Sequence, residues 1–354
     1  MPRVADLVTS ADEAIPARTA VAPRKRVARA ALLAGMALLG TSGCQALPAS
    51  FQPVTREGLA VSNLFNLELA LSALLFLLVA GVLGLALVRF RGQPGAVDPP
   101  QTAGNRRLEI TWTVLPALVL AVMFGLAVWT MRTVDASAPG AMPITVIGHQ
   151  WWWEFQYPDQ HVVTANELHA PAGTPLQLAI QSADVIHSFW VPEFGWMRDA
   201  IPGKTNSMSV QVAQPGEFLG ACTQYCGTEH AWMRIRVVTE PRDQFDAWLQ
   251  QQQRPAAAPA NATAARGQQV FLQNTCVNCH MIAGTSAQGS VGPDLTHVGS
   301  RATLGAGVLA NSPENLRDWI HDAQAVKPGA LMPNFRDLPD ADLQALVTYL
   351  EGLQ

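Results

Sequence analysis

The hydropathy of the chain changes three times along its length, and each change predicts a different kind of structure. Residues 69–88 form a run of 20 residues without a charged side chain, and residues 110–131 form a second run of 22. A helix needs about 20 apolar residues to cross a hydrocarbon core of about 30 Å. A buried soluble helix is the alternative for either run, but two such runs close together favour a membrane hairpin. We therefore predict helices at about residues 65–89 and 109–132, within a segment 44–136.

Beyond Pro143 the pattern changes to a period of two. Apolar residues alternate with polar or small ones in three short stretches, at positions 176–180, 208–212 and 234–237, and Pro-Gly pairs lie at 202–203 and 215–216. Short alternating stretches separated by turn residues are typical of antiparallel strands with one buried face. Residues 137–250 are therefore predicted to form a β sandwich or barrel.

The third change comes after a segment without a core-forming pattern. Residues 251–263 are rich in Gln, Ala and Pro, a composition typical of a linker. Beyond it the apolar spacing becomes helical, and Leu343, Leu346, Val347 and Leu350 lie on one face of a last helix. The predicted fold is therefore multidomain, with a two-helix transmembrane hairpin, a β sandwich, and an all-α domain at residues 264–354.

Basic residues indicate how the hairpin is oriented. Arg89, Arg91, Arg106 and Arg107 lie in or beside the loop between the two apolar runs. Because cytoplasmic loops carry an excess of positive charge, this loop is predicted to be cytoplasmic and both outer ends to face the periplasm.

The N-terminus resembles a bacterial secretory signal. Basic residues at 24–29 precede an apolar run at 30–40, and Thr-Ser-Gly-Cys follows at 41–44. Residues 1–43 are predicted to be a signal peptide and Cys44 a lipid attachment site. The alternative is ordinary cleavage near Ala49, which would remove Cys44. The signal agrees with the orientation of the hairpin, and together they place a multi-pass protein in the bacterial inner membrane.

Composition narrows the function. Charged residues make up 14% of the chain, below the ~25% of a typical soluble protein, and the formal net charge is -4. A chain without a basic stripe is not expected to bind nucleic acid. The five cysteines fall as one single and two close pairs, with a histidine beside each pair. Two small-loop disulfides are the alternative, but this arrangement favours metal and cofactor ligands.

The first cysteine pair lies in a short segment rich in soft metal ligands. Cys222, Cys226, His230 and Met233 occupy twelve residues. Thiolate, imidazole and thioether ligands select copper or an iron–sulfur cluster over magnesium or calcium. Two thiolates can bridge two copper ions, and His187, which lies 35 residues before Cys222, is the candidate second imidazole.

The second pair forms a C-x-x-C-H box, the attachment signature of c-type haem. Cys276 and Cys279 would tether the haem, and His280 would bind its iron. Met332, between two prolines and 52 residues downstream, is the candidate sixth ligand. A zinc or redox C-x-x-C is the alternative for the box, and His297 and His321 are alternative iron ligands.

Together these motifs resemble cytochrome c oxidase subunit 2. His187 and Cys-x-x-x-Cys-Gly-x-x-His-x-x-Met resemble its CuA domain, residues 148–155 resemble its aromatic strand, and residues 198–203 and 109–116 also match. The resemblance covers residues 55–250 and implies a cupredoxin-like sandwich. Residues 264–354, including Gly-Pro-Asp-Leu at 292–295, resemble a class I cytochrome c in which Pro293 supports His280.

The resemblance implies roles for individual residues. Cys222 and Cys226 would bridge the coppers, His187 and Met233 would complete one copper, and His230 and the backbone carbonyl of Gln224 would complete the other. Trp151 would be the surface relay for incoming electrons, and Glu109 would lie at the mouth of a proton channel into the partner subunit. The family usually has glutamate at position 224, where it helps to hold magnesium, so Gln224 leaves magnesium binding open.

As a whole, the chain resembles the variant of this subunit that carries a fused cytochrome c. That implies the electron-transfer subunit of cytochrome c oxidase, with electrons passing from a donor through haem c and CuA to the haem–copper site of subunit 1. There oxygen is reduced to water and protons are pumped, so no catalytic residue is expected in this chain. Expected partners are subunits 1 and 3, the membrane, and cytochrome c or quinol–cytochrome c reductase as donor.

Three other classes fit the motifs less well. A copper chaperone would lack His230, Met233 and the haem box, and a quinol-oxidase subunit would lack the copper ligands. A reductase of nitrogen oxides can carry a CuA domain, but the two membrane helices and Glu109 favour the oxygen-reducing complex.

The linker is predicted to leave the haem domain mobile enough to dock near Trp151.

Overall fold

The computed structural model describes residues 49–92, 95, 101 and 104–354. The predicted signal peptide and Cys44 lie outside these residues. Short 3-10 turns occur at Ala49–Phe51 (η1), Pro158–Gln160 (η2), Pro192–Phe194 (η3), His230–Trp232 (η4) and Val298–Ser300 (η5).

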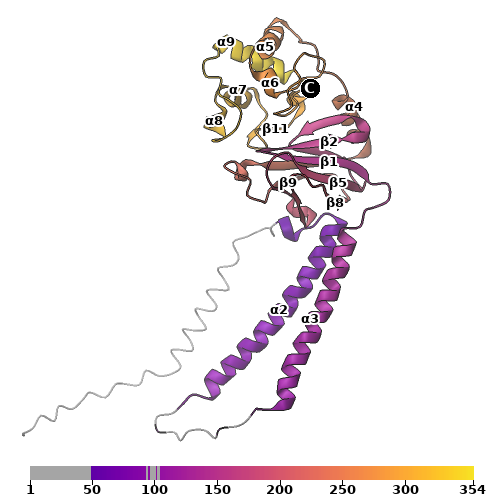
Figure 1. The fold of residues 1–354 in the computed structure, drawn as a ribbon, viewed down its shortest axis with the longest axis vertical. Coiled ribbons are helices and arrows are strands. Elements are labelled where there is room, and N and C mark those ends of the chain that lie inside the picture. Colours follow the sequence, from indigo (N-terminus) through magenta and orange to yellow (C-terminus); the bar gives the residue numbers. More distant parts are fainter. Residues whose placement is uncertain (1–48, 93–94, 96–100, 102–103) are drawn as a thin grey trace, which may run out of the picture. The chain divides into compact units, whose positions relative to one another are not determined.

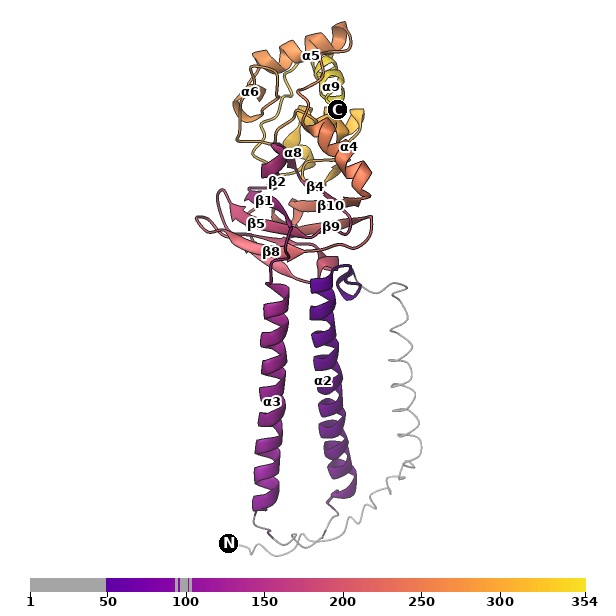
Figure 2. The same ribbon diagram turned by 90° about the vertical axis from the view of Figure 1, so that its right-hand side faces the viewer.

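Two long helices form the N-terminal hairpin. Helices α2 (Arg56–Arg89) and α3 (Arg106–Val134) lie side by side in both Figure 1 and Figure 2. Their most apolar windows are 0% and 6% buried within the chain, so this apolar surface is free to contact lipid or another subunit.

Helix α2 begins at Arg56, nine residues before the predicted start near residue 65. Thr55 caps it, because its Oγ1 accepts a hydrogen bond of 2.8 Å from the Gly58 amide and donates one of 2.9 Å to the Phe194 carbonyl. The polar first turns of the helix therefore pack against the next domain, which an apolar run cannot indicate.

The second domain is a sandwich of two five-stranded sheets. The first has the order β3-β2-β1-β5-β8 and the second β4-β10-β9-β6-β7. Most pairs are antiparallel, as predicted, but β1 pairs with β5 and β10 with β4 in parallel. The strands are β1 Met142–His149, β2 Trp152–Tyr157, β3 Val162–Ala165, β4 Glu167–Pro171, β5 Leu176–Ser182, β6 His187–Trp190, β7 Met197–Ala200, β8 Asn206–Val210, β9 Gly216–Cys222 and β10 Arg234–Glu240.

The core of the sandwich follows the predicted alternation. On β5, Leu176, Leu178 and Ile180 are buried and the residues between them are only half-buried. Trp153, Phe155 and Phe189 complete the core, and Trp153 and Phe155 each meet Phe189 edge to face. This core continues directly to Cys222, Cys226 and Met233, so the candidate ligands sit at the end of a rigid scaffold.

A helix that the sequence did not indicate, α4 (Arg242–Gln252), closes the sandwich domain. Residues 253–261 then connect it to a mostly helical C-terminal domain, close to the predicted linker. That domain contains α5 (Ala262–Gln273), α6 (Cys276–Cys279), α7 (Pro313–His321), α8 (Ala323–Val326), α9 (Asp340–Glu351), and a small hairpin of β11 (Thr303–Leu304) and β12 (Leu309–Ala310). The predicted sandwich and helical domain are thus both present.

Candidate metal centre and adjacent cavity

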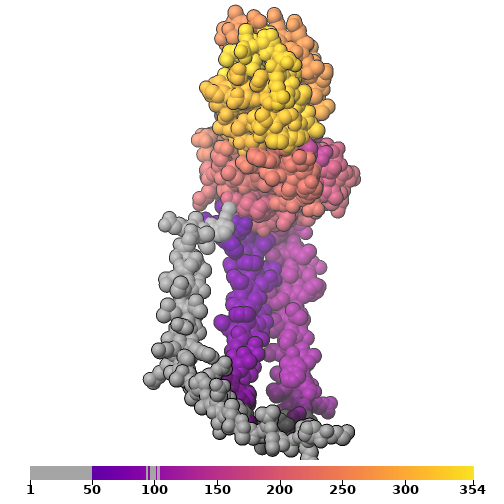
Figure 3. All heavy atoms as spheres, turned by 90° about the vertical axis from the view of Figure 1, so that its left-hand side faces the viewer, coloured from indigo at the N-terminus to yellow at the C-terminus, as the bar shows by residue number. Residues whose placement is uncertain are grey.

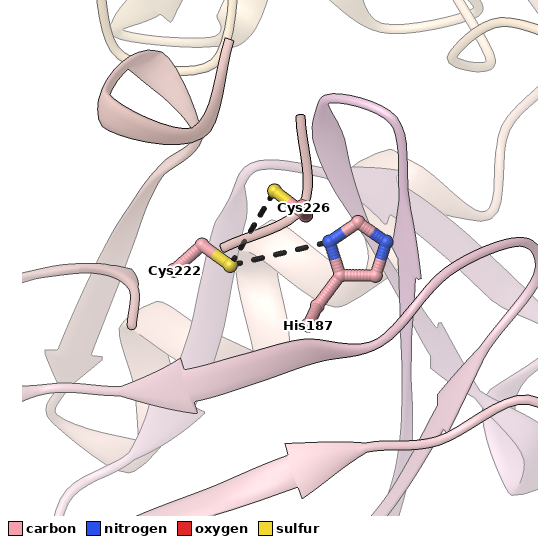
Figure 4. A group of neighbouring side chains, drawn as sticks. All are labelled: His187, Cys222 and Cys226. Carbon is pink, nitrogen blue, oxygen red and sulfur yellow. Dashed lines mark hydrogen bonds between the residues drawn. The ribbon is translucent and has the colours of Figure 1, made fainter. Parts of the chain in front are cut away.

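Two sulfur atoms form the middle of the candidate metal centre. Cys222 ends β9 and Cys226 lies in the loop that follows, and their Sγ atoms are 3.8 Å apart (Figure 4). A disulfide bond is about 2.05 Å long, so these are free thiols. None of the four cysteines that the structure describes is in a disulfide.

Strand pairing brings His187 to the sulfurs. His187 begins β6, which pairs with β9 so that Phe189 lies opposite Cys222. Its Nδ1 is 4.0 Å from the Cys222 Sγ, and its side chain is buried. His187, Cys222 and Cys226 therefore present one nitrogen and two sulfurs within 4.8 Å of one another. Figure 4 shows the three side chains pointing toward one another.

Asp184 orients this imidazole, a role that the sequence did not suggest. Its Oδ1 lies 2.7 Å from Nε2 of His187, and its Oδ2 accepts a hydrogen bond of 2.7 Å from the backbone amide of Gln150. With Nε2 engaged, Nδ1 is left for a metal, which is the usual arrangement of a ligating histidine. The sequence signal that could have identified this role is the position of an acidic residue three positions before a candidate ligand.

The remaining predicted ligands surround the sulfurs. The Cys226 Sγ lies 3.7 Å from Nδ1 of His230 and 3.9 Å from Sδ of Met233, while the Gln224 carbonyl oxygen lies 3.2 Å from the Cys222 Sγ. His230 begins the short 3-10 turn η4, and Met233 caps the end of that turn. All six predicted donor groups thus come together, and this soft donor set fits copper.

The electrostatics of the centre also fit a metal. The hydrogen bond between the two sulfurs lowers the pKa of Cys222 to about 3 and raises the pKa of Cys226, so one thiolate forms readily while the second proton is held. Burial alone would lower the pKa of His187, but its hydrogen bonds with Cys222 and Asp184 raise it. A bound cation favours loss of the remaining proton, because thiolates rather than thiols are metal ligands.

Trp151 contacts the cysteine loop directly. Its indole Nε1 donates a hydrogen bond of 3.0 Å to the Cys226 carbonyl, and the Gln150 side chain donates one of 2.8 Å to the same oxygen. Gly227 has φ +118°, and a Cβ there would lie 2.9 Å from the Trp151 ring. Glycine therefore permits both the loop conformation and the close contact with the indole.

A large cavity lies in the C-terminal domain, and Trp151 lines it too. Its walls include all four predicted haem-binding residues, Cys276, Cys279, His280 and Met332. The His280 Nδ1 is 2.8 Å from the Pro293 carbonyl, which leaves Nε2 for a metal, and burial lowers the pKa of His280 so that the imidazole stays neutral.

Arg301 adds a cation to this cavity that sequence reasoning missed. It donates a hydrogen bond to the Asp294 carbonyl, and its Nε is buried with no hydrogen-bond partner among the described residues. Burial lowers the pKa of this guanidinium. A mostly apolar cavity with two thiols, an imidazole, a thioether and an unsatisfied cation fits a haem, whose carboxylates the cation can bind.

Other predicted residues lie elsewhere. Glu109 is in the first turn of α3 with an exposed side chain, away from both sites. The alternative iron ligands, His297 and His321, are absent from the described cavity lining, and Nε2 of His297 lies 3.0 Å from the Arg254 carbonyl. Trp151 is half-buried between the two sites, whereas the sequence predicted a surface position.

Comparisons with known families match three parts of the chain. Residues 47–132 match the family described as cytochrome C oxidase subunit II, transmembrane domain. Residues 160–240 match cytochrome C oxidase subunit II, periplasmic domain, and residues 264–354 match cytochrome c. The matches follow the division into hairpin, sandwich and helical domain.

Individual proteins are similar over most of the chain. Cytochrome c oxidase subunit 2 of Alkalihalophilus pseudofirmus is 35% identical over 295 residues, covering 81% of this chain and 85% of its own. The Bacillus subtilis protein of the same name is 30% identical over 289 residues, covering 76% and 81%. The crystal structure of the periplasmic domain of subunit II from Bradyrhizobium japonicum is 30% identical with a TM-score of 0.32, covering 33% of this chain and 96% of its own.

Proposed function

The chain belongs to the cytochrome c oxidase subunit II family and carries a cytochrome c domain, and we propose that it passes electrons from a donor through haem c and binuclear CuA to subunit 1. The family membership confirms the prediction from the motifs. When bound, the haem and the copper centre would each accept and release one electron, with oxygen reduction and proton pumping located in the partner subunit. The contribution of this chain is to hold, orient and shield these groups.

In this proposal Cys222 and Cys226 would together hold two copper ions. His187 and Met233 would supply the other ligands of one ion, and His230 and the Gln224 carbonyl those of the second. The donor atoms converge within 3.2 to 4.0 Å of the sulfurs, and Asp184 holds the His187 ring in place. A pre-formed shell, with Cys222, Cys226, His187 and Met233 buried, limits rearrangement when charge changes, which suits rapid electron transfer.

The haem would be held by the residues that line the cavity. Cys276 and Cys279 would form thioether bonds to it, His280 and Met332 would bind the iron, and Arg301 would bind a carboxylate. The Pro293 carbonyl supports this by fixing the His280 tautomer. A His and Met pair is the combination that raises the potential of cytochromes c.

The position of Trp151 is the single observation that carries the proposal. Its indole N–H bonds to the carbonyl of the copper ligand Cys226, and the same residue lines the cavity that holds His280 and Met332. One residue therefore contacts both sites, and electrons from the haem would reach the copper through it.

The membrane-facing parts complete the assignment. The apolar surfaces of α2 and α3 would contact subunit 1 and lipid, and subunit 3 would belong to the same complex. The loop that connects α2 to α3 would lie on the cytoplasmic side. The sandwich and haem domain would then face the periplasm of a bacterial inner membrane. Glu109 would lie at the mouth of a proton channel, Cys44 would carry a lipid, and Gln224 would contact magnesium only through an uncharged group.

An optical spectrum with metal analysis of the purified subunit tests this function. We expect a low-spin c-type haem, a near-infrared band from mixed-valence copper, and two coppers and one haem per chain. One copper per chain, or none, would contradict the binuclear assignment. Turnover with cytochrome c or with quinol–cytochrome c reductase, compared between the full oxidase and one lacking residues 260–354, identifies the donor. Unchanged turnover after this deletion would contradict a path through the haem domain.

A further inference from the structure

A buried carboxylate joins the haem domain to the sandwich. Glu167, the first residue of β4, is 4% exposed, and it accepts hydrogen bonds from three groups of the haem domain. These are the Ala302 amide at 3.1 Å, the Thr303 amide at 2.9 Å and the Thr303 hydroxyl at 2.8 Å. Hydrogen bonds to an ionised acceptor are about twice as strong as neutral ones, and a buried charge without them is strongly unfavourable.

A buried cation makes a second connection between the domains. Lys327 is 4% exposed, and its Nζ donates hydrogen bonds to the Trp151 carbonyl at 3.1 Å and to the Gly305 carbonyl at 3.3 Å. Its Nζ also lies 3.9 Å from the carboxylate of Glu229, which is 1% exposed. Lys327 begins the loop that ends at Met332, so this contact ties the loop of a candidate iron ligand to Trp151.

The backbones of the two domains approach closely around these side chains. The Arg234 amide donates a hydrogen bond of 3.2 Å to the Ala306 carbonyl, and Ala306 packs against Trp152. Gly329 has φ +102°, and a Cβ there would lie 2.9 Å from the Thr228 side chain, so a larger residue would push the surfaces apart. Figure 3 shows the orange and yellow C-terminal domain resting directly on the sandwich.

The connecting segment is also held in place. The Gln253 side chain donates a hydrogen bond of 2.9 Å to the Gln160 carbonyl in the sandwich. Further on, the Ala256 amide donates one of 3.1 Å to the Ala283 carbonyl in the haem domain. These anchors on both sides differ from the free tether that the Gln, Ala and Pro composition predicted.

We infer that Glu167 and Lys327 form an interdomain latch that keeps the haem domain docked on Trp151 throughout turnover. The inference rests on the proposed function and deepens it, because electron delivery to copper then needs no domain movement. It also implies that an external donor must deliver to the haem domain, since the docked domain covers Trp151. Glu167 acts by positioning the two domains, and Lys327, which also lines the cavity, acts through its hydrogen bond to the Trp151 carbonyl.

The test measures haem-to-copper electron transfer in the complete oxidase after photoreduction of the haem, in buffers of increasing viscosity. A docked domain predicts a wild-type rate that is independent of viscosity. Glu167→Gln removes the ionised acceptor, and Lys327→Met removes both donated hydrogen bonds. The double variant should transfer electrons from haem to copper about tenfold more slowly, because docking is weakened. Its rate should also depend on viscosity. Glu217→Gln, the same change on strand β9 of the same sheet, is the control and should leave the rate unchanged.

A second measurement reads the latch without relying on either cofactor. Amide hydrogen exchange at Ala302 and Thr303 should be slow in the wild type and faster in Glu167→Gln, with exchange in the sandwich core unchanged. A viscosity-dependent wild-type rate, or unaltered exchange at these two amides in Glu167→Gln, overturns the latch while leaving the proposed function intact. Slow exchange at both amides in a wild type that does not reduce its copper from the haem overturns the proposed function instead.

Discussion

The indole N–H of Trp151 donates a hydrogen bond of 3.0 Å to the carbonyl oxygen of Cys226. Cys226 is a candidate copper ligand, and Trp151 lines the candidate haem cavity. Trp151 therefore contacts two sites that come from sequence segments far apart, and its neighbour Gln150 does the same.

This contact predicts the effect of Trp151→Phe. The ring is largely retained, but the hydrogen bond to the copper-ligand loop is lost, so electron transfer from haem to copper should slow. The net loss of stability should be only about 1 kcal/mol, as for a typical hydrogen bond. Transient absorption and thermal unfolding measure the two effects. Trp248→Phe is the control, because Trp248 stacks on His169 elsewhere in the sandwich, and an equal slowing there would contradict a relay role for Trp151.

Asp184→Asn tests the orientation of His187. The carboxylate fixes the ring so that Nδ1 faces the sulfurs, and such partners typically contribute 10–100-fold to metal affinity. We expect a loss of copper affinity in that range, about one order of magnitude or more, with the haem spectrum unchanged. Competition with a copper chelator measures it. Asp159→Asn, in the turn η2, is the control, and equal copper affinity in the two variants would contradict the orienting role.

The two cysteine pairs should be separable by mutation. Cys222→Ser removes one bridging sulfur and should abolish the near-infrared band while leaving haem attachment intact. Cys279→Ala removes one thioether and should leave the haem attached through at most a single bond, with the copper band retained. Metal analysis and a denaturing gel stained for covalent haem report both results. Loss of haem in Cys222→Ser would indicate that the domains do not fold independently of their cofactors.

The candidate sites were largely predictable because most of their donors are local in sequence. Cys222, Cys226, His230 and Met233 lie within one short segment, and one strand pairing adds His187. Asp184 was missed although it lies three residues from His187. In the sequence, an acidic turn residue that orients a ligand cannot be distinguished from one that is simply exposed to solvent.

The contacts between the domains could not be predicted in the same way. Glu167 meets Thr303 across 136 positions, and Lys327 meets Trp151 across 176. A single Glu or Lys in a polar stretch is usually exposed, and only the docked arrangement buries these two. The composition of the linker likewise gave no sign of the hydrogen bonds that Gln253 and Ala256 make with neighbouring surfaces.

The pKa of Lys327 predicts how docking depends on pH. Burial lowers this pKa to about 8, despite the opposing effect of Glu229, whereas an exposed lysine has a pKa of about 10.4. Between these values the separated form binds more protons than the docked form, so raising the pH favours docking by up to about 1.4 kcal/mol per pH unit. Below about pH 8 both forms are protonated and the dependence disappears. The neutral amine can still donate to the Trp151 and Gly305 carbonyls.

The free energy of domain separation, obtained from exchange at Ala302 and Thr303 after correction for the intrinsic chemical rate, should therefore rise between pH 8 and about 10. In Lys327→Met the same quantity should be flat over this window, because the titrating group is gone. A wild-type value that falls with pH would mean that the ammonium stabilises docking more than its burial opposes it. That outcome would reverse the expected pH dependence of the free energy of domain separation. The charge of Lys327, rather than its hydrogen bonds, would then contribute most to the contact.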